Sequence, residues 1–185
     1  MQVSIGTKYY LSTGAIVGYN THMDIWMLQW KSRIITTLLW LPARIGSRVS
    51  GCMVKRNITY GRDRHQVLDM YVPQQPTERP APVVIVIHGG GWLGGDKTEQ
   101  AYFCTKLAKN GYVVCAINYR LAPRHQFPAA LADCELAAAW VSAHITSYGG
   151  DPSRTFLAGS SAGAHLAALA AGRGAIAGIK GLVLY

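Results

Sequence analysis

The segment TFLAGSSAGAHLAAL, Thr155 to Leu169, begins as an apolar run and continues as an alanine-rich stretch, with small residues at the junction. The first five residues are typical of a buried strand, and residues 162–173 are expected to form a helix. One glycine lies two residues before Ser161 and another two residues after it, which fits the pattern G-x-S-x-G. The segment therefore predicts a strand, a sharp turn and a helix, with Ser161 at the turn.

The residues before and after this segment alternate between strand and helix signals. Val83 to His88 is a β-branched run typical of a strand buried on both faces of a sheet. Two earlier runs, CMVKRNITYG and HQVLDMYVP, predict a hairpin, and a Pro-rich stretch follows them. Further strands are expected at 112–119 and 179–185, and helices at 98–110 and 127–148. This order predicts an α/β fold with a mostly parallel sheet flanked by helices.

A glycine run, HGGGW from His88 to Trp92, directly follows the Val83 to Ile87 strand. Without side chains, the backbone N–H groups of such a run can reach the oxygen of a bound carbonyl. Either motif alone has a plainer explanation, because small residues also let a helix pack on a strand and glycines also form ordinary turns. The two motifs together favour an acyl-transfer scaffold with Ser161 as nucleophile, since Ser160 lies off the centre of its pattern.

Four stretches carry a resemblance to a known family: HGGGWLGGDK, INYRLAPRHQFPAALADCELAAAWV, GGDPSRTFLAGSSAGAHLAAL and VLDMYVP. They resemble the α/β-hydrolase superfamily, and within it the hormone-sensitive-lipase-like carboxylesterases and the related feruloyl and acetyl esterase (BD-FAE-like) group. The resemblance implies the α/β-hydrolase fold over residues 51–185 and Ser161 as the nucleophile. It also implies an oxyanion hole made by the backbone N–H groups of Gly90, Gly91 and Ala162. The positions expected to support this machinery are His88, Gly89, Gly159 and Gly163.

The sequence departs from the family pattern after Ser161. In this fold the triad order is Ser, then Asp or Glu, then His, but no acidic residue comes after Ser161 and His165 is the only later histidine. His165 lies on the same predicted helix as Ser161 and is expected to be a packing residue. We therefore expect a C-terminally truncated hydrolase domain, about the N-terminal two-thirds, with little or no esterase activity of its own. Ala164 replaces a further glycine that is usual in the family.

Residues 1–50 carry none of the motifs described above and are predicted to form a helical extension. Met27, Trp30, Ile34, Leu38 and Leu41 recur at helical spacing and place one apolar face on a helix. Packing on the same domain is the simplest role of this helix. The alternatives are a cap over the active site, as in the family, and weak contact with a membrane surface through residues 23–41.

Composition narrows the classes of function further. The formal net charge is +9, but the 18 Lys and Arg residues are scattered, and no nucleic-acid-binding motif accompanies them. The four cysteines have no metal or redox spacing and are expected to be reduced, so neither a metal nor a cofactor is expected. No signal peptide or membrane-spanning segment is evident, which favours a cytoplasmic location. No feature indicates an oligomeric state.

These observations favour a carboxylic ester hydrolase acting on a small-molecule ester. Two alternatives remain open. One is a non-catalytic remnant that keeps the pocket to bind a ligand or partner, and the other is a serine peptidase of the same fold.

Overall fold

The computed structural model describes residues 51–75, 79–174, 176 and 178–185. This part of the chain forms one six-stranded sheet with the strand order β1-β2-β4-β3-β5-β6. The strands are β1 (Cys52–Thr59), β2 (Val67–Pro73), β3 (Ala81–Ile87), β4 (Val113–Ile117), β5 (Gly150–Gly159) and β6 (Ile179–Leu184). The α-helices are α2 (Ala101–Lys109), α3 (Ala129–His144) and α4 (Ala162–Gly172), and the 3-10 helices are η1 (Lys97–Gln100) and η2 (Ile145–Tyr148).

The sheet is parallel over its four strands β4, β3, β5 and β6. The antiparallel hairpin of β1 and β2 extends it, with β2 pairing antiparallel to β4. Ile87 at the end of β3 lies opposite both Ile117 and Gly159, so the carboxyl ends of three neighbouring strands are level. The chain passes from β3 to β4 on one side of β3, and then from β4 to β5 on the other side of β3. Ligands of open α/β sheets bind outside the strand ends at such a switch point.

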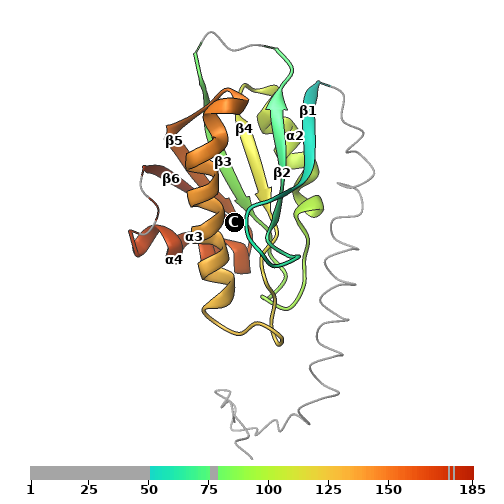
Figure 1. Ribbon diagram of the computed structural model, residues 1–185, viewed down its shortest axis with the longest axis vertical. Coiled ribbons are helices and arrows are strands. Elements are labelled where there is room, and N and C mark those ends of the chain that lie inside the picture. Colours follow the sequence, from blue (N-terminus) through green and yellow to red (C-terminus); the bar gives the residue numbers. More distant parts are fainter. Residues whose placement is uncertain (1–50, 76–78, 175, 177) are drawn as a thin grey trace, which may run out of the picture.

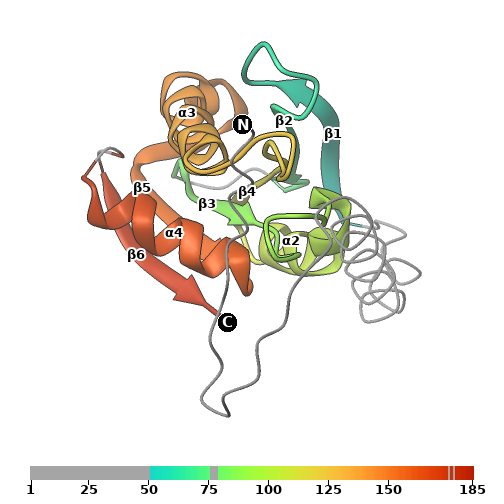
Figure 2. The same ribbon diagram turned by 90° about the horizontal axis from the view of Figure 1, so that it is seen from below.

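Helices cover both faces of the sheet (Figure 1). Apolar side chains of α3 and α4 pack with those of β2, β3, β4 and β5 in the larger core cluster. Those of α2 pack with Val84, Val86 and Val114 on the other face. Figure 2 shows the end of β6 next to the start of α4, where Ser161 N donates to Tyr185 O at 2.7 Å. The central strands are therefore buried on both sides, as their continuous apolar sequences predict.

This architecture confirms the predicted fold class, and the element boundaries differ in detail. The helix expected at 98–110 begins as η1, where the Asp96 side chain accepts a hydrogen bond from Thr98 N. The helix expected from Phe127 begins at Ala129, because a residue that precedes proline disfavours the helical conformation. Strand β5 begins at Gly150, earlier than expected, since its first residues pair with Ala81 and Pro82.

The predicted extension over residues 1–50, including the helix expected at 23–41, lies outside the described residues. Among the residues that are described, no helix is long and apolar enough to cross a membrane.

Candidate active site

Ser161 lies at the turn between β5 and α4. Its backbone has φ 50° and ψ −116°, a conformation that L residues adopt only when the surrounding structure forces it. The side chain of Ser161 is exposed, whereas Ser160 is buried. The structure thus presents one of the two adjacent serines to solvent, above the carboxyl end of the sheet.

Two glycines allow this turn to be so tight. A Cβ placed on Gly159 would lie 2.4 Å from the carbonyl oxygen of Gly163. A Cβ placed on Gly163 would lie 2.1 Å from the carbonyl oxygen of Ile87. Both contacts are with backbone and cannot be relieved by moving a side chain. Glycine at these positions lets the first turn of α4 pack directly against the ends of β5 and β3.

The glycine run after β3 lies beside Ser161 although it is distant in sequence. An added Cβ on Gly89 would be 3.3 Å from the Cβ of Ser161. Gly90 and Gly91 have φ values of 117° and 60°, and the carbonyl of Gly90 accepts hydrogen bonds from Leu93 N and Gly94 N at 3.1 and 3.0 Å. The run therefore curls back on itself next to the serine.

The backbone N–H groups near this junction differ in what they bind. Among the described residues, the backbone N–H groups of Ser161 and Gly163 donate to backbone carbonyl oxygens in turns or loops. Those of Gly90, Gly91 and Ala162 donate none of these hydrogen bonds. Ala162 is also the first residue of α4, where the helix dipole favours negative charge.

His88 is buried beneath the glycine run and is held by several contacts. Its ring stacks on Tyr119 with centroids 4.3 Å apart, and its Nδ1 lies 2.7 Å from the carbonyl oxygen of Gly89. Tyr119 also donates its hydroxyl to the carbonyl oxygen of His88 at 2.9 Å. Burial disfavours the charged imidazolium and lowers the pKa of His88 to about 4. His88 is thus a neutral side chain that shapes the start of the loop.

His165 is exposed on α4, and its ring packs edge-on against Trp92 with centroids 5.4 Å apart. Its backbone N–H donates to Ser161 O at 3.1 Å within the helix. Over residues 51–185, without the gaps at 76–78, 175 and 177, no hydrogen bond joins the Ser161 hydroxyl to a histidine ring. The ring of His165 thus packs on Trp92, and its backbone N–H belongs to the hydrogen bonding of α4.

An apolar cavity of about 470 Å³ opens beside the glycine run. Gly91 and Trp92 form one wall, His165 and Leu166 of α4 a second, and the loop after β4 a third. Phe127 in that loop is 74% exposed at the edge of the cavity. The residues of this third wall lie in a stretch that carries the family resemblance, but none of them is predicted from the sequence to line a pocket, because no spacing pattern in the loop after β4 indicates one.

A buried carboxylate fixes the loop after β4. Asp133 on α3 is fully buried and accepts hydrogen bonds from the Arg120 backbone N–H, the Arg120 guanidinium and the Gln66 amide. Ala122 N also donates to Trp92 O at 2.9 Å and ties the loop to the glycine run. The cavity wall thus has a rigid support.

At the start of β5, Asp151 and Arg154 form an ion pair at 2.8 Å.

The structure also brings together Asp63, His65 and His125, a group that the sequence does not predict. Asp63 and His65 are close in sequence, but His125 comes from a distant loop and no ligand spacing connects it with them.

All four cysteines are free thiols, and three of them, Cys104, Cys115 and Cys134, are buried.

A serine at a strand-to-helix turn, with a glycine run from the neighbouring strand beside it, is the arrangement of the α/β-hydrolase class. The chain belongs to the BD-FAE family, whose model matches residues 68–181. The solved esterase B from Lactobacillus rhamnosis, inhibited by a tributyrin phosphonate, has the same fold with a TM-score of 0.74 and 30% identity. The match covers 81% of this chain and 50% of that one.

Curated relatives are also named as esterases. Esterase LipC from Mycobacterium tuberculosis is 40% identical over 117 residues, which are 63% of this chain and 29% of LipC. A probable isoprenylcysteine alpha-carbonyl methylesterase from Oryza sativa is 35% identical over 161 residues, 83% of this chain and 36% of that protein. The chain thus spans about a third of the length of these relatives.

Proposed function

We propose that this chain carries the nucleophile and oxyanion hole of a carboxylic ester hydrolase, with Ser161 as nucleophile. The observation that carries the proposal is the exposed Ser161 in its strained turn, with Gly89 of the glycine run packed against it. A hydroxyl presented in this way can approach a substrate carbonyl without steric hindrance from its own backbone.

The oxyanion would be held by the backbone N–H groups of Gly90, Gly91 and Ala162. The support for this assignment is that these amides take part in none of the loop hydrogen bonds of the described residues. Ala162 adds the positive end of the α4 dipole. Donors placed in advance where negative charge develops make one of the largest contributions to catalysis.

In the reaction, Ser161 Oγ attacks the ester carbonyl and its proton passes to a general base. The tetrahedral intermediate then expels the alcohol, which takes that proton, and water releases the acid from the acyl-enzyme. His88 is fully buried and held by Tyr119 and the Gly89 carbonyl, and His165 packs on Trp92, so we assign the role of base to neither. We infer that the base lies outside the residues that the structure describes and that the chain by itself hydrolyses esters negligibly.

The cavity beside Gly91 indicates the substrate class. Its walls are mainly apolar side chains, among them Trp92, Leu93 and Phe127. An apolar acyl or alcohol group would bury its surface there, because removing such a group from water is favourable. Small-molecule esters with one apolar group are therefore the proposed substrates, in agreement with relatives that are named as esterases.

The proposal is tested by measuring hydrolysis of p-nitrophenyl butyrate by the 185-residue chain and by the chain joined to the C-terminal region of LipC. We expect turnover only in the extended protein. Ser161→Ala should reduce that turnover at least about a thousandfold. The matched control Ser160→Ala changes the neighbouring serine and should retain it.

Turnover that survives Ser161→Ala would show that the nucleophile lies elsewhere. An extended protein that binds the ester without hydrolysing it would favour the non-catalytic alternative. Cleavage of peptides in preference to esters would favour a peptidase.

A further inference from the structure

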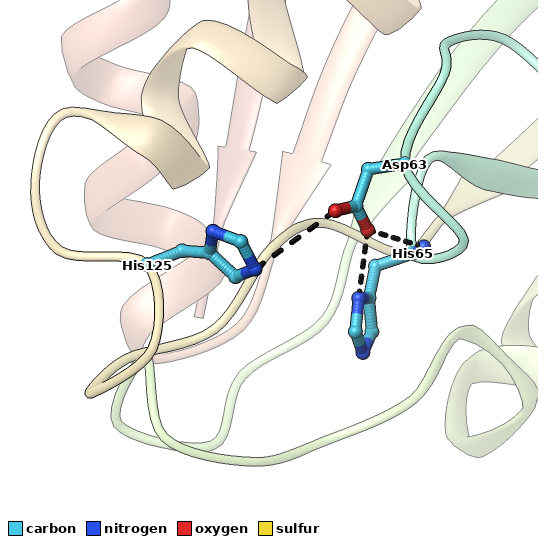
Figure 3. A group of neighbouring side chains, drawn as sticks. All are labelled: Asp63, His65 and His125. Atoms are coloured by element: carbon cyan, nitrogen blue, oxygen red, sulfur yellow. Dashed lines mark hydrogen bonds and ion pairs between the residues drawn. The ribbon is translucent and has the colours of Figure 1, made fainter.

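Three side chains with metal-binding atoms meet between the loop that joins β1 to β2 and the loop after β4 (Figure 3). Asp63 and His65 come from the loop between β1 and β2, and His125 comes from the loop after β4. The Nδ1 of His65 lies 2.9 Å from Asp63 Oδ1, and the Nε2 of His125 lies 3.9 Å from Asp63 Oδ2. One ligand atom from each residue can be chosen so that all lie within 4.8 Å of one another.

The loop that carries Asp63 and His65 is held in place by its own hydrogen bonds. Tyr60 N donates to Gln66 O at 3.0 Å, and Gln66 N donates to Asp63 O at 2.9 Å. The amide oxygen of Gln66 accepts from Asp63 N at 2.9 Å. The backbone positions of the two ligands are therefore fixed before any ion binds.

Further contacts join this loop to the segment that carries His125. The Tyr60 hydroxyl donates to the carbonyl oxygen of Asn118. Gln66 also donates to the buried Asp133, which binds Arg120 as well. His125 N bonds to Leu121 O at 3.0 Å. The three side chains thus meet between two braced loops, and ordering a site there costs little conformational entropy.

The set of donors selects a class of ion. Two imidazoles and one carboxylate suit Zn²⁺ and similar transition metals, which accept three protein ligands and leave a position for water or a substrate. Mg²⁺ and Ca²⁺ require oxygen ligands and are disfavoured. Tetrahedral zinc at its usual bond lengths separates its ligand atoms by about 3.3 Å, and the separations of the two imidazole nitrogens from the Asp63 oxygens are 2.9 and 3.9 Å.

We propose that Asp63, His65 and His125 bind one Zn²⁺ or a similar transition-metal ion, which links the two loops. The side chains are 22 to 30% exposed, so an ion can reach them from solvent. Binding through Nδ1 of His65 replaces its contact with Asp63, and the single proton of the neutral ring then resides on Nε2. The proposal does not depend on the esterase function.

The surroundings of the cluster indicate what occupies the open position of the metal. His65 and His125 line a polar cavity of about 510 Å³, which is also lined by Arg64, Arg124, Asp96 and Glu99. The two guanidinium groups and the two carboxylates balance in formal charge, so the lining favours neither an anion nor a cation. Water is therefore the ligand that we expect at the open position of the metal. His125 also lines the apolar cavity beside Gly91, so the ion would fix a residue shared by both cavities.

The test uses the untagged 185-residue chain and titrates Zn²⁺ by calorimetry and Co²⁺ by visible absorption. We expect one ion per chain and a Co²⁺ spectrum without thiolate charge-transfer bands, because no cysteine takes part. Asp63→Asn, His65→Gln and His125→Gln should each weaken Zn²⁺ binding at least about tenfold. The matched control is His144→Ala, which removes a histidine that stacks on Trp140 at the surface and should leave binding unchanged. Mg²⁺ should not compete.

Circular dichroism checks that each variant is folded. If a variant does not fold, histidine NMR of the unsubstituted chain decides instead: Zn²⁺ should shift the ring resonances of His65 and His125 but not those of His144. Binding weaker than about 0.1 mM, equal binding by the His125→Gln variant, or shifts confined to other histidines would each overturn the proposal.

Discussion

The strained backbone of Ser161 makes an unusual prediction about stability. At φ 50° and ψ −116°, any residue with a Cβ is strained by about 1 to 3 kcal/mol, whereas glycine is not. Replacing alanine by glycine normally costs about 0.4 to 1 kcal/mol, because glycine gives the unfolded chain more freedom. The strain relieved at position 161 exceeds that cost. Ser161→Gly should therefore be more stable than Ser161→Ala by about 1 kcal/mol, the difference between these two contributions.

The assay is urea unfolding of both variants, followed by circular dichroism. A difference of about 1 kcal/mol moves the midpoint by about 0.5 M at a typical slope for a small domain. Ala168→Gly is the control, because Ala168 is exposed within α4 and glycine there should lower stability by about 1 kcal/mol. If glycine at position 161 is less stable than alanine, as at position 168, the turn is not strained and the reasoning fails.

Two other predictions concern groups that support the site. Asp133→Ala should lower the free energy of unfolding by about 3 to 5 kcal/mol, because it leaves the Arg120 guanidinium and the Gln66 amide without their buried partner. Urea unfolding measures this loss, with Asp151→Ala as the control because it removes a carboxylate near the surface. A midpoint shift no larger than that of the control would contradict the prediction. His88 has a folded-state pKa of about 4 against an ordinary 6.5, so stability should be fully present above pH 6.5 and fall by about 3 kcal/mol as the pH drops toward 4. His88→Gln should flatten this pH dependence, and an unchanged slope would show that His88 is not the group responsible.

Much of the fold could be predicted because its signals are local. The continuous apolar sequence of β3 and the glycines around Ser161 are readable in short windows, and the alternation of strands and helices implies a parallel sheet. The starts of η1 and α3 differ because of a local cap and a proline, whereas the start of β5 depends on a tertiary contact. β5 extends back to Gly150 because Ala81 is there to pair with it, which the residues of β5 alone do not reveal.

The candidate site was predictable only where its residues belong to motifs. Ser161 and the run from Gly89 to Gly91 are flanked by elements with clear periodicity, so their meeting at one edge of the sheet could be expected. The meeting of His125 with Asp63 depends on how two loops fold over each other. No periodic pattern encodes that proximity, and nothing in the sequence indicates that Asp63 and His125 are partners.

The most direct test of the central claim is the structure of the extended protein after reaction with a phosphonate ester, which leaves a covalent mimic of the tetrahedral intermediate. We predict a bond from phosphorus to Ser161 Oγ, with the phosphoryl oxygen about 3 Å from the backbone nitrogens of Gly90, Gly91 and Ala162. An adduct on another residue, or a phosphoryl oxygen beyond hydrogen-bond reach of all three nitrogens, would contradict the assignment of nucleophile and oxyanion hole.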